Sequence, residues 1–135
     1  MSTLLLDSSV VLAAIKPDDR HHESSAALLA DGSTVLATLD LARYEVTNVA
    51  VRAWSAPAAV APLLRILDRI GADGGVVESS ARLIAHAAEL AGDHTISVYD
   101  AAYVAAAAEA GCGLVSCDVR DLVSKGLAEL PGAVA

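Results

Sequence analysis

Short apolar runs without polar interruption alternate along the chain with longer stretches whose apolar residues recur at helical spacing. Runs of the first kind are typical of strands buried on both faces, as in a parallel sheet. They predict strands at residues 3–6, 34–37 and 112–116, and a short strand or extended loop at 74–77. Such strands need a layer of helices on each side to cover them.

The periodic stretches predict six helices, at residues 10–15, 21–30, 41–52, 62–70, 80–91 and 98–110. Pro17 stops the first helix, and Pro62 suits a first turn better than a helix interior. Ser97 and Asp100 form a capping-box pattern, in which Ser97 accepts from the Asp100 backbone N–H and the Asp100 carboxylate reaches back to Ser97. Gly111 ends this last helix.

Strands that alternate with helices predict a three-layer α/β/α fold with a mostly parallel central sheet and right-handed crossovers. With 135 residues, the chain is expected to form one domain, residues 1–135, around a single core. The tail from residue 127 shows no clear pattern of strand or helix, and it has room for a short edge strand.

Composition narrows the class of protein. Hydrophobic residues make up 55% of the chain and charged residues 19%, which excludes a disordered protein. No apolar run approaches the about 20 residues that span a bilayer, and Asp7 interrupts the opening run too early for a signal peptide. We therefore expect a cytoplasmic protein with no membrane segment, in which Cys112 and Cys117 are buried free thiols rather than a disulfide.

Acidic residues stand where the predicted fold brings distant segments together. Asp7 and Asp118 follow strands at their carboxyl ends, and Asp100 begins the helix that leads to the last strand. Glu45 lies in the helix after the second strand, and Asn48 shares its face at i+3 spacing. The carboxyl ends of parallel strands are where open α/β sheets place their functional sites. We expect these four acids to meet there.

Such a cluster of carboxylates predicts a metal site. Each close pair of carboxylates costs several kcal/mol at an effective dielectric constant of about 20, unless protonation or a divalent cation neutralises the charge. Oxygen ligands without sulfur favour Mg²⁺ or Mn²⁺. A cation held in this way can bind a phosphodiester and activate water. The net charge of −8 argues against a protein that coats nucleic acid through a basic patch, but not against a nuclease whose acids hold metal.

Four segments of the chain resemble the PIN-domain signature. They are Asp7 with Ser9 after the first apolar run, and the segments 44–48 (YEVTN), 97–101 (SVYDA) and 114–118 (LVSCD). In order and spacing they span essentially the whole chain. More narrowly, they are similar to the VapC toxins of bacterial type II toxin–antitoxin systems.

The resemblance implies a metal-dependent endoribonuclease that leaves a 5′-phosphate, forms a homodimer and is held inactive by a cognate antitoxin protein. Ser9 and Ser116 match the hydroxyl positions that support the site, with Ser116 where Thr is common in the family. The acidic quartet, which would bind the metal and carry catalysis, is matched by Asp7, Glu45, Asp100 and Asp118.

Further residues extend this hypothesis. Asp121 is either a fifth acid or, as we expect, a helix cap or a supporting residue behind the metal ligands. Arg43 and Arg120 lie close in sequence to Glu45 and Asp118, so we expect them to contact phosphate. Because the chain has no Phe and few other aromatic residues, recognition of RNA through backbone shape and charge is expected.

Other functions remain open at this stage. A phospho-acceptor receiver or phosphatase-like domain would use Asp7 or Asp100, but it would also need a lysine at a later strand end, and Lys125 lies beyond the last strand. A catalytically silent interaction module would use the acids only as caps and surface charges. A histidine-based ribonuclease would keep its activity in EDTA.

Overall fold

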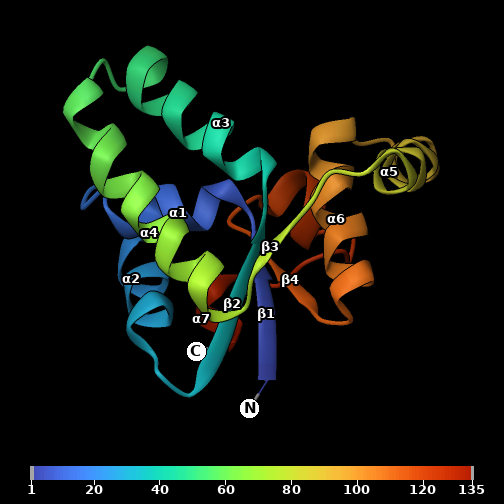
Figure 1. The fold of residues 1–135 in the computed structure, drawn as a ribbon, viewed down its shortest axis with the longest axis horizontal. Helices are drawn as coiled ribbons and strands as arrows, with labels where there is room; N and C mark the ends of the chain where they lie inside the picture. Colours follow the sequence, from blue (N-terminus) through green and yellow to red (C-terminus); the bar gives the residue numbers. More distant parts are fainter. Residues whose placement is uncertain (1, 135) are drawn as a thin grey trace.

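A parallel sheet of four strands in the order β3-β2-β1-β4 forms the centre of the molecule (Figure 1). The computed structural model describes residues 2–134. The strands are β1 (Ser2–Leu6), β2 (Thr34–Leu39), β3 (Val76–Val77) and β4 (Gly113–Val115). Every pairing between them is parallel. The expected strands are therefore confirmed, and 74–77 contributes a short strand rather than a loop.

β1 is a central strand of this sheet, as its unbroken apolar sequence predicts. Leu4 pairs with Leu36 on one side and with Gly113 on the other. Leu5 and Leu6 are fully buried. A strand enclosed on both faces gains stability from every apolar side chain, which is why it carries no polar alternation.

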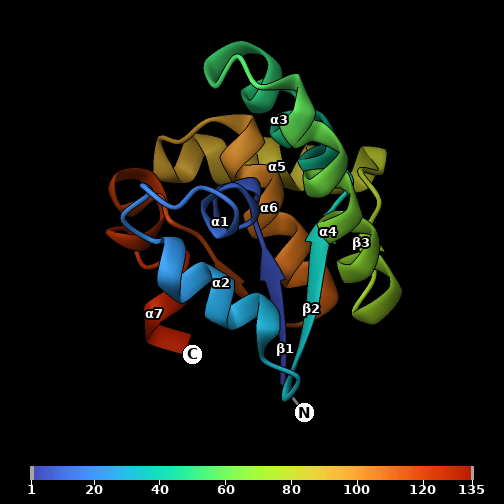
Figure 2. The same cartoon turned by 90° about the vertical axis from the view of Figure 1, so that its left-hand side faces the viewer.

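Helices cover both faces of the sheet, which confirms the three-layer α/β/α architecture. In Figures 1 and 2, α1, α2 and α4 lie on one side and α5 and α6 on the other. The bounds are α1 (Ser8–Ala14), α2 (His22–Ala30), α3 (Leu41–Asn48), α4 (Val60–Asp73), α5 (Ala81–His94), α6 (Val98–Ala110) and α7 (Pro131–Val134). Among residues 2–134, no helix has both the length and the apolar character to cross a membrane.

The region between α3 and α4 differs from the sequence prediction. The helix predicted to reach residue 52 ends as an α-helix at Asn48 and continues as a π-helical turn over Val49–Ala53. The left-handed φ of 49° at Ser55 then reverses the chain. α4 begins at Val60, so Pro62 lies inside its first turn, where its missing N–H would have had no partner within the helix.

The segments around β4 also refine the prediction. Cys112 precedes β4 and Cys117 follows it, and both are free thiols of intermediate burial rather than fully buried. The expected edge strand in the tail is reduced to one parallel bridge between Val115 and Glu129, after which α7 begins.

Two elements approach the sheet closely. The side of α6 that packs on β1 and β2 is rich in buried alanine, which lets its backbone lie near the sheet. At Gly74, a Cβ atom would lie 2.4 Å from the carbonyl oxygen of Leu36, so only glycine fits there. α3 and the start of α4 rise beyond the carboxyl ends of the strands (Figure 1).

Candidate active site

Asp7 lies at the carboxyl end of β1 and is almost completely buried, with 5% of its surface exposed. Its carboxylate caps α1, accepting a hydrogen bond from the backbone N–H of Ser9 (3.1 Å) and another from the Ser9 hydroxyl. Burial raises the pKa of Asp7 to about 6, against the opposing effect of hydrogen bonds from Ser116 and Ser9. A carboxyl group with this pKa can gain or lose a proton near neutral pH.

Serine hydroxyls join the end of β1 to the end of β4. Ser9 Oγ accepts the backbone N–H of Cys117 at 2.9 Å and lies 3.5 Å from Ser116 Oγ. Ser116 Oγ in turn accepts the backbone N–H of Asp118 at 3.0 Å. These bonds fix the position of the Asp118 backbone relative to Asp7.

Glu45 points from α3 toward the core and is held by two residues that the sequence analysis did not select. Its Oε1 atom accepts from Ser8 Oγ at 3.0 Å and from the Tyr103 hydroxyl at 2.6 Å. Burial and the neighbouring Glu45 raise the pKa of Tyr103, so the phenol stays a hydrogen-bond donor. Tyr103 could have been identified from the sequence by its position three residues after Asp100, which puts both residues on the same face of α6.

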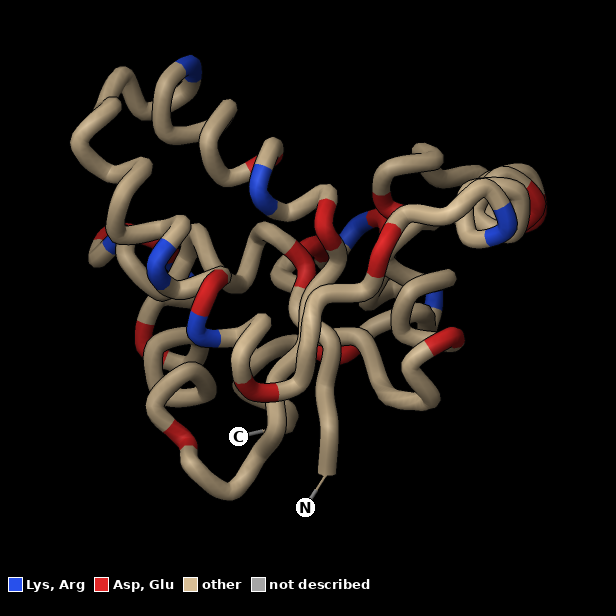
Figure 3. The backbone as a smooth tube through the Cα atoms, viewed as in Figure 1, with Lys and Arg blue, Asp and Glu red and all other residues tan. Residues whose placement is uncertain are grey.

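Asp100, Asp118 and Asp121 each bring a carboxylate oxygen to one place, with all three oxygens within 4.8 Å of one another. Partial burial, followed by the charges of Asp118, Asp121 and Glu45, raises the pKa of Asp100. Glu45 therefore belongs to the same electrostatic neighbourhood. Figure 3 shows acidic positions from several segments gathered beyond the carboxyl ends of the strands, between α3 and α6.

Two details of capping differ from expectation. Ser97 Oγ accepts the Asp100 backbone N–H at 3.0 Å, as predicted. The return bond from the Asp100 carboxylate to Ser97 does not occur among the hydrogen bonds of residues 2–134, so that carboxylate remains available to the acidic group. Asp118, not Asp121, caps the following turn by accepting the Asp121 backbone N–H at 2.9 Å. Asp121 instead contributes its side chain to the cluster.

The other residues selected from the sequence, Arg120, Arg43 and Asn48, do not all lie in the same place. Arg120 pairs with Asp121 at the edge of the cluster, at 3.2 Å and 3.1 Å, while 89% of its own side chain stays exposed. This pair lowers the pKa of Asp121. Arg43 and Asn48 are exposed and line a hollow on the outer face of α3, away from the inward-facing Glu45.

The alternatives gain no support from the geometry. The Lys125 ammonium donates to the carbonyl oxygens of His94 (2.6 Å) and Thr95 (3.2 Å) instead of facing Asp7, as a receiver domain would require. His22 Nδ1 is bonded to the carbonyl of Ala13 at 2.8 Å. In the described part of the chain, the group of side chains close enough to share a metal ion consists of aspartates.

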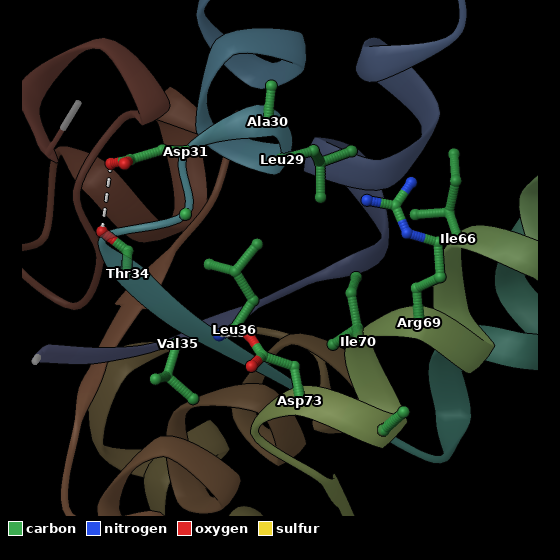
Figure 4. Close-up of a pocket in the computed structure, with 12 residues that line it drawn as sticks. Leu29, Ala30, Asp31, Thr34, Val35, Leu36, Ile66, Arg69, Ile70 and Asp73 are labelled. Carbon is green, nitrogen blue, oxygen red and sulfur yellow. Dashed lines mark hydrogen bonds between the residues drawn. The ribbon is translucent and has the colours of Figure 1, made fainter.

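A cavity of about 500 Å³ lies at the opposite end of the sheet from the acidic cluster, between α2, α4 and the start of β2 (Figure 4). Its walls are mainly apolar, with Leu36 and Ile70 among them. The two acids at its edge are engaged locally: Asp31 accepts from Ser33 and Thr34, and Asp73 accepts from the Leu36 backbone N–H at 2.9 Å. The chemistry-bearing residues therefore gather at the carboxyl edge, not in this cavity.

Comparison with known proteins finds a matching family model and several similar proteins. The PIN domain model matches residues 4–124. Ribonuclease VapC3 of Pyrobaculum aerophilum is 32% identical over 130 residues, which cover 90% of this chain and 93% of the relative. VapC20 of Mycobacterium tuberculosis, a Sarcin-Ricin loop cleaving toxin, has a TM-score of 0.76 at 24% identity, over 94% of this chain and 98% of its own.

A toxin–antitoxin complex from Klebsiella pneumoniae also contains this fold, with a TM-score of 0.65 at 16% identity over 95% of this chain and 97% of that one. At such identity the two solved structures establish the likeness of fold alone. The family model and the 32% identical relative establish more, because each covers nearly the whole chain. On this evidence, the chain belongs to the PIN-domain family.

Proposed function

We propose that this chain is a divalent-metal-dependent endoribonuclease, the toxin of a toxin–antitoxin pair. The observation that carries the proposal is the meeting of Asp100, Asp118 and Asp121, with Glu45 in the same electrostatic neighbourhood and the buried Asp7 at the end of β1. The names of the relatives agree with it: one is a ribonuclease and another is a Sarcin-Ricin loop cleaving toxin.

The donor set fits a hard cation. Carboxylate oxygens of Asp100, Asp118 and Asp121 within 4.8 Å of one another could bind Mg²⁺ or Mn²⁺, with Asp7 and Glu45 completing the acidic site. When bound, the cation would neutralise the carboxylates, polarise a phosphodiester and make water more acidic. Burial first, and then repulsion from Asp118, Asp121 and Glu45, raise the pKa of Asp100, and a bound cation would relieve that repulsion.

The chain's own residues supply positioning. Ser8 and Tyr103 hold one oxygen of Glu45, so its orientation is set before substrate arrives. Asp7 is fixed by hydrogen bonds from the Ser9 backbone N–H and hydroxyl, so its carboxylate is also oriented before substrate arrives. Arg120 lies at the edge of the acidic group, where its exposed guanidinium can meet a phosphate.

The test is RNA cleavage by the purified full-length chain. We expect new 5′-phosphate ends with Mg²⁺ or Mn²⁺, and none in EDTA or with the Asp100→Asn variant. Glu109→Gln, an exposed acid at the far end of α6, is the matched control and should keep the activity. Cleavage that persists in EDTA, or in Asp100→Asn, would refute the proposal.

Two partners belong to the same proposal. A cognate antitoxin should relieve the growth inhibition caused by the wild-type chain, as the Klebsiella pneumoniae complex suggests. Ile84 on α5 and Val98 and Tyr99 at the start of α6 expose 48%, 45% and 64% of their surface, which supports burial in a homodimer. Sedimentation of the chain with and without the antitoxin tests both partners.

A further inference from the structure

The outer face of α3 and the π-helical turn after it carries a shallow hollow of about 480 Å³. It is lined by Arg43, Tyr44, Thr47, Asn48, Val51 and Arg52. The chain has 17 acidic residues against 9 basic ones, yet this hollow contains two arginines and no acid. It is therefore a locally cationic surface on an acidic protein.

The hollow and Glu45 belong to the same helix, α3, and its continuation. Tyr44 precedes Glu45 and Asn48 follows it by three residues along α3, although their side chains lie on the outer face and that of Glu45 points inward. Arg52 lies seven residues beyond Glu45, about 10 Å along the helix axis at about 1.5 Å per residue. A flexible ligand bound in the hollow could thus continue past Glu45 to the acidic site.

The charged and aromatic side chains of the hollow are exposed. In residues 2–134, neither Arg43 nor Arg52 takes part in a salt bridge. Tyr44 has 80% of its surface exposed, and Val51 has 45%. An exposed aromatic ring between two unpaired guanidinium groups matches what single-stranded nucleic acid needs: cations for the backbone and a flat surface for a base.

We propose that this hollow binds single-stranded RNA next to the phosphate to be cleaved, with Arg43 and Arg52 on backbone phosphates and Tyr44 stacked on a base. The inference rests on the proposed nuclease function and adds to it the path of the substrate. It also changes the expectation that RNA is recognised through its backbone shape and charge alone. The ring of Tyr44 supplies a stacking surface that the low aromatic content did not suggest.

Binding without cleavage provides the test. The full-length chain carrying Asp100→Asn is titrated into a labelled single-stranded oligoribonucleotide, in buffer without divalent cations, at several salt concentrations. Adding Arg43→Gln and Arg52→Gln together should lower the slope of log K against log salt by about 1.4, since each phosphate contact on a single strand contributes about 0.7. Tyr44→Ala should weaken binding about tenfold, whereas Tyr44→Phe should not.

The matched control removes the same charge elsewhere. Arg65→Gln with Arg82→Gln changes two exposed arginines on α4 and α5, and it should keep the slope. An equal fall of the slope in both double variants would overturn the proposal, because net charge alone would explain it. A change from dimer to monomer on sedimentation of the Arg43/Arg52 variant would overturn it too, by assigning this face to a second copy of the chain.

Cleavage of the same oligoribonucleotide by the wild-type chain with Mg²⁺ is measured separately. If the hollow variants bind as expected and the wild type does not cleave, the binding surface stands and the nuclease function fails. If the wild type cleaves and the hollow variants bind RNA like the starting protein, the hollow fails and the nuclease function stands.

Discussion

The Tyr103 hydroxyl and Ser8 Oγ donate to the same oxygen of Glu45, the former at 2.6 Å and the latter at 3.0 Å. Tyr103 belongs to α6 and Ser8 to α1, so Glu45 on α3 is tied to both helical layers. In residues 2–134 its other oxygen, Oε2, has no hydrogen-bond partner, which leaves it available to a ligand. Tyr103 and Ser8 thus orient Glu45 through Oε1 and leave Oε2 free for a ligand.

Tyr103→Phe tests this relationship. The ring keeps its packing, because Tyr103 is 2% exposed, but Glu45 loses its shorter hydrogen bond. We expect RNA cleavage to fall about 10- to 100-fold, the usual effect of removing a group that orients an acid at a metal site. The measurement is kcat/KM with Mg²⁺, with the melting temperature as control. Undiminished kcat/KM would show that Glu45 needs no such support.

Ser9→Ala should destabilise the fold. The change removes the acceptor of the Cys117 backbone N–H and a donor to Asp7. We expect the free energy of unfolding to fall by about 1–3 kcal/mol in urea titrations, since a part-buried donor is left without its partner. Ser33→Ala is the matched control: its hydroxyl donates to Asp31 in the same two-residue pattern, but in an exposed turn. It should change stability by less than about 0.5 kcal/mol.

Asp7→Asn should make stability depend on pH in a defined direction. The pKa of Asp7 is about 6 in the fold against 3.8 as a model value. Its contribution to stability is therefore present below about pH 3.8 and is lost as the pH rises through about 6. In EDTA, Asp7→Asn should exceed the wild type by about 3 kcal/mol above pH 6, and this gain should vanish toward pH 3.8.

Asp31→Asn is the control of opposite sign. Hydrogen bonds from Ser33 and Thr34 lower the pKa of Asp31, so its contribution is present above the unfolded pKa and is lost as the pH falls through the folded value. This variant should be less stable than the wild type at neutral pH and equal to it in acid. Asp7 and Asp31 variants that respond to pH in the same direction would contradict the assignment for Asp7.

The sequence was most informative where local pattern and tertiary position coincide. Asp7 and Asp118 follow apolar strands, and parallel strands bring their carboxyl ends to one edge, so their approach could be predicted from the order of elements. Asp121 was expected to be a cap or a supporting residue, because an acidic residue near a turn is typical of a helix cap. Only the actual path of the turn shows that Asp118 caps it and Asp121 faces the acids.

Other features depend on packing that no local pattern encodes. The Tyr103 hydroxyl reaches Glu45 because α6 lies close to the sheet. The small buried alanines of α6 allow that close approach. The change from α- to π-helix after Asn48 likewise has no counterpart in helix propensity.

Divalent cations should stabilise the wild-type chain. A cation that binds only the folded state adds about 2.7 kcal/mol at a hundredfold excess over its Kd, so Mg²⁺ or Mn²⁺ should raise the melting temperature. Asp100→Asn should abolish most of this rise, and Glu109→Gln should retain it. An identical rise in Asp100→Asn would place the cation away from the triplet of Asp100, Asp118 and Asp121.

Arg120→Gln should separate metal binding from RNA binding. The Arg120–Asp121 pair is exposed, so its loss should leave the free energy of unfolding nearly unchanged. Without the guanidinium, Asp121 and its neighbours attract a cation more strongly, and isothermal titration should show Mn²⁺ binding a few-fold tighter. RNA should bind more weakly, with a salt slope lower by about 0.7 for one phosphate contact. Arg82→Gln, an exposed arginine away from the acids, should change neither affinity. Weaker binding of both Mn²⁺ and RNA in Arg120→Gln would mean that the guanidinium organises the acidic site itself instead of competing with the cation for Asp121.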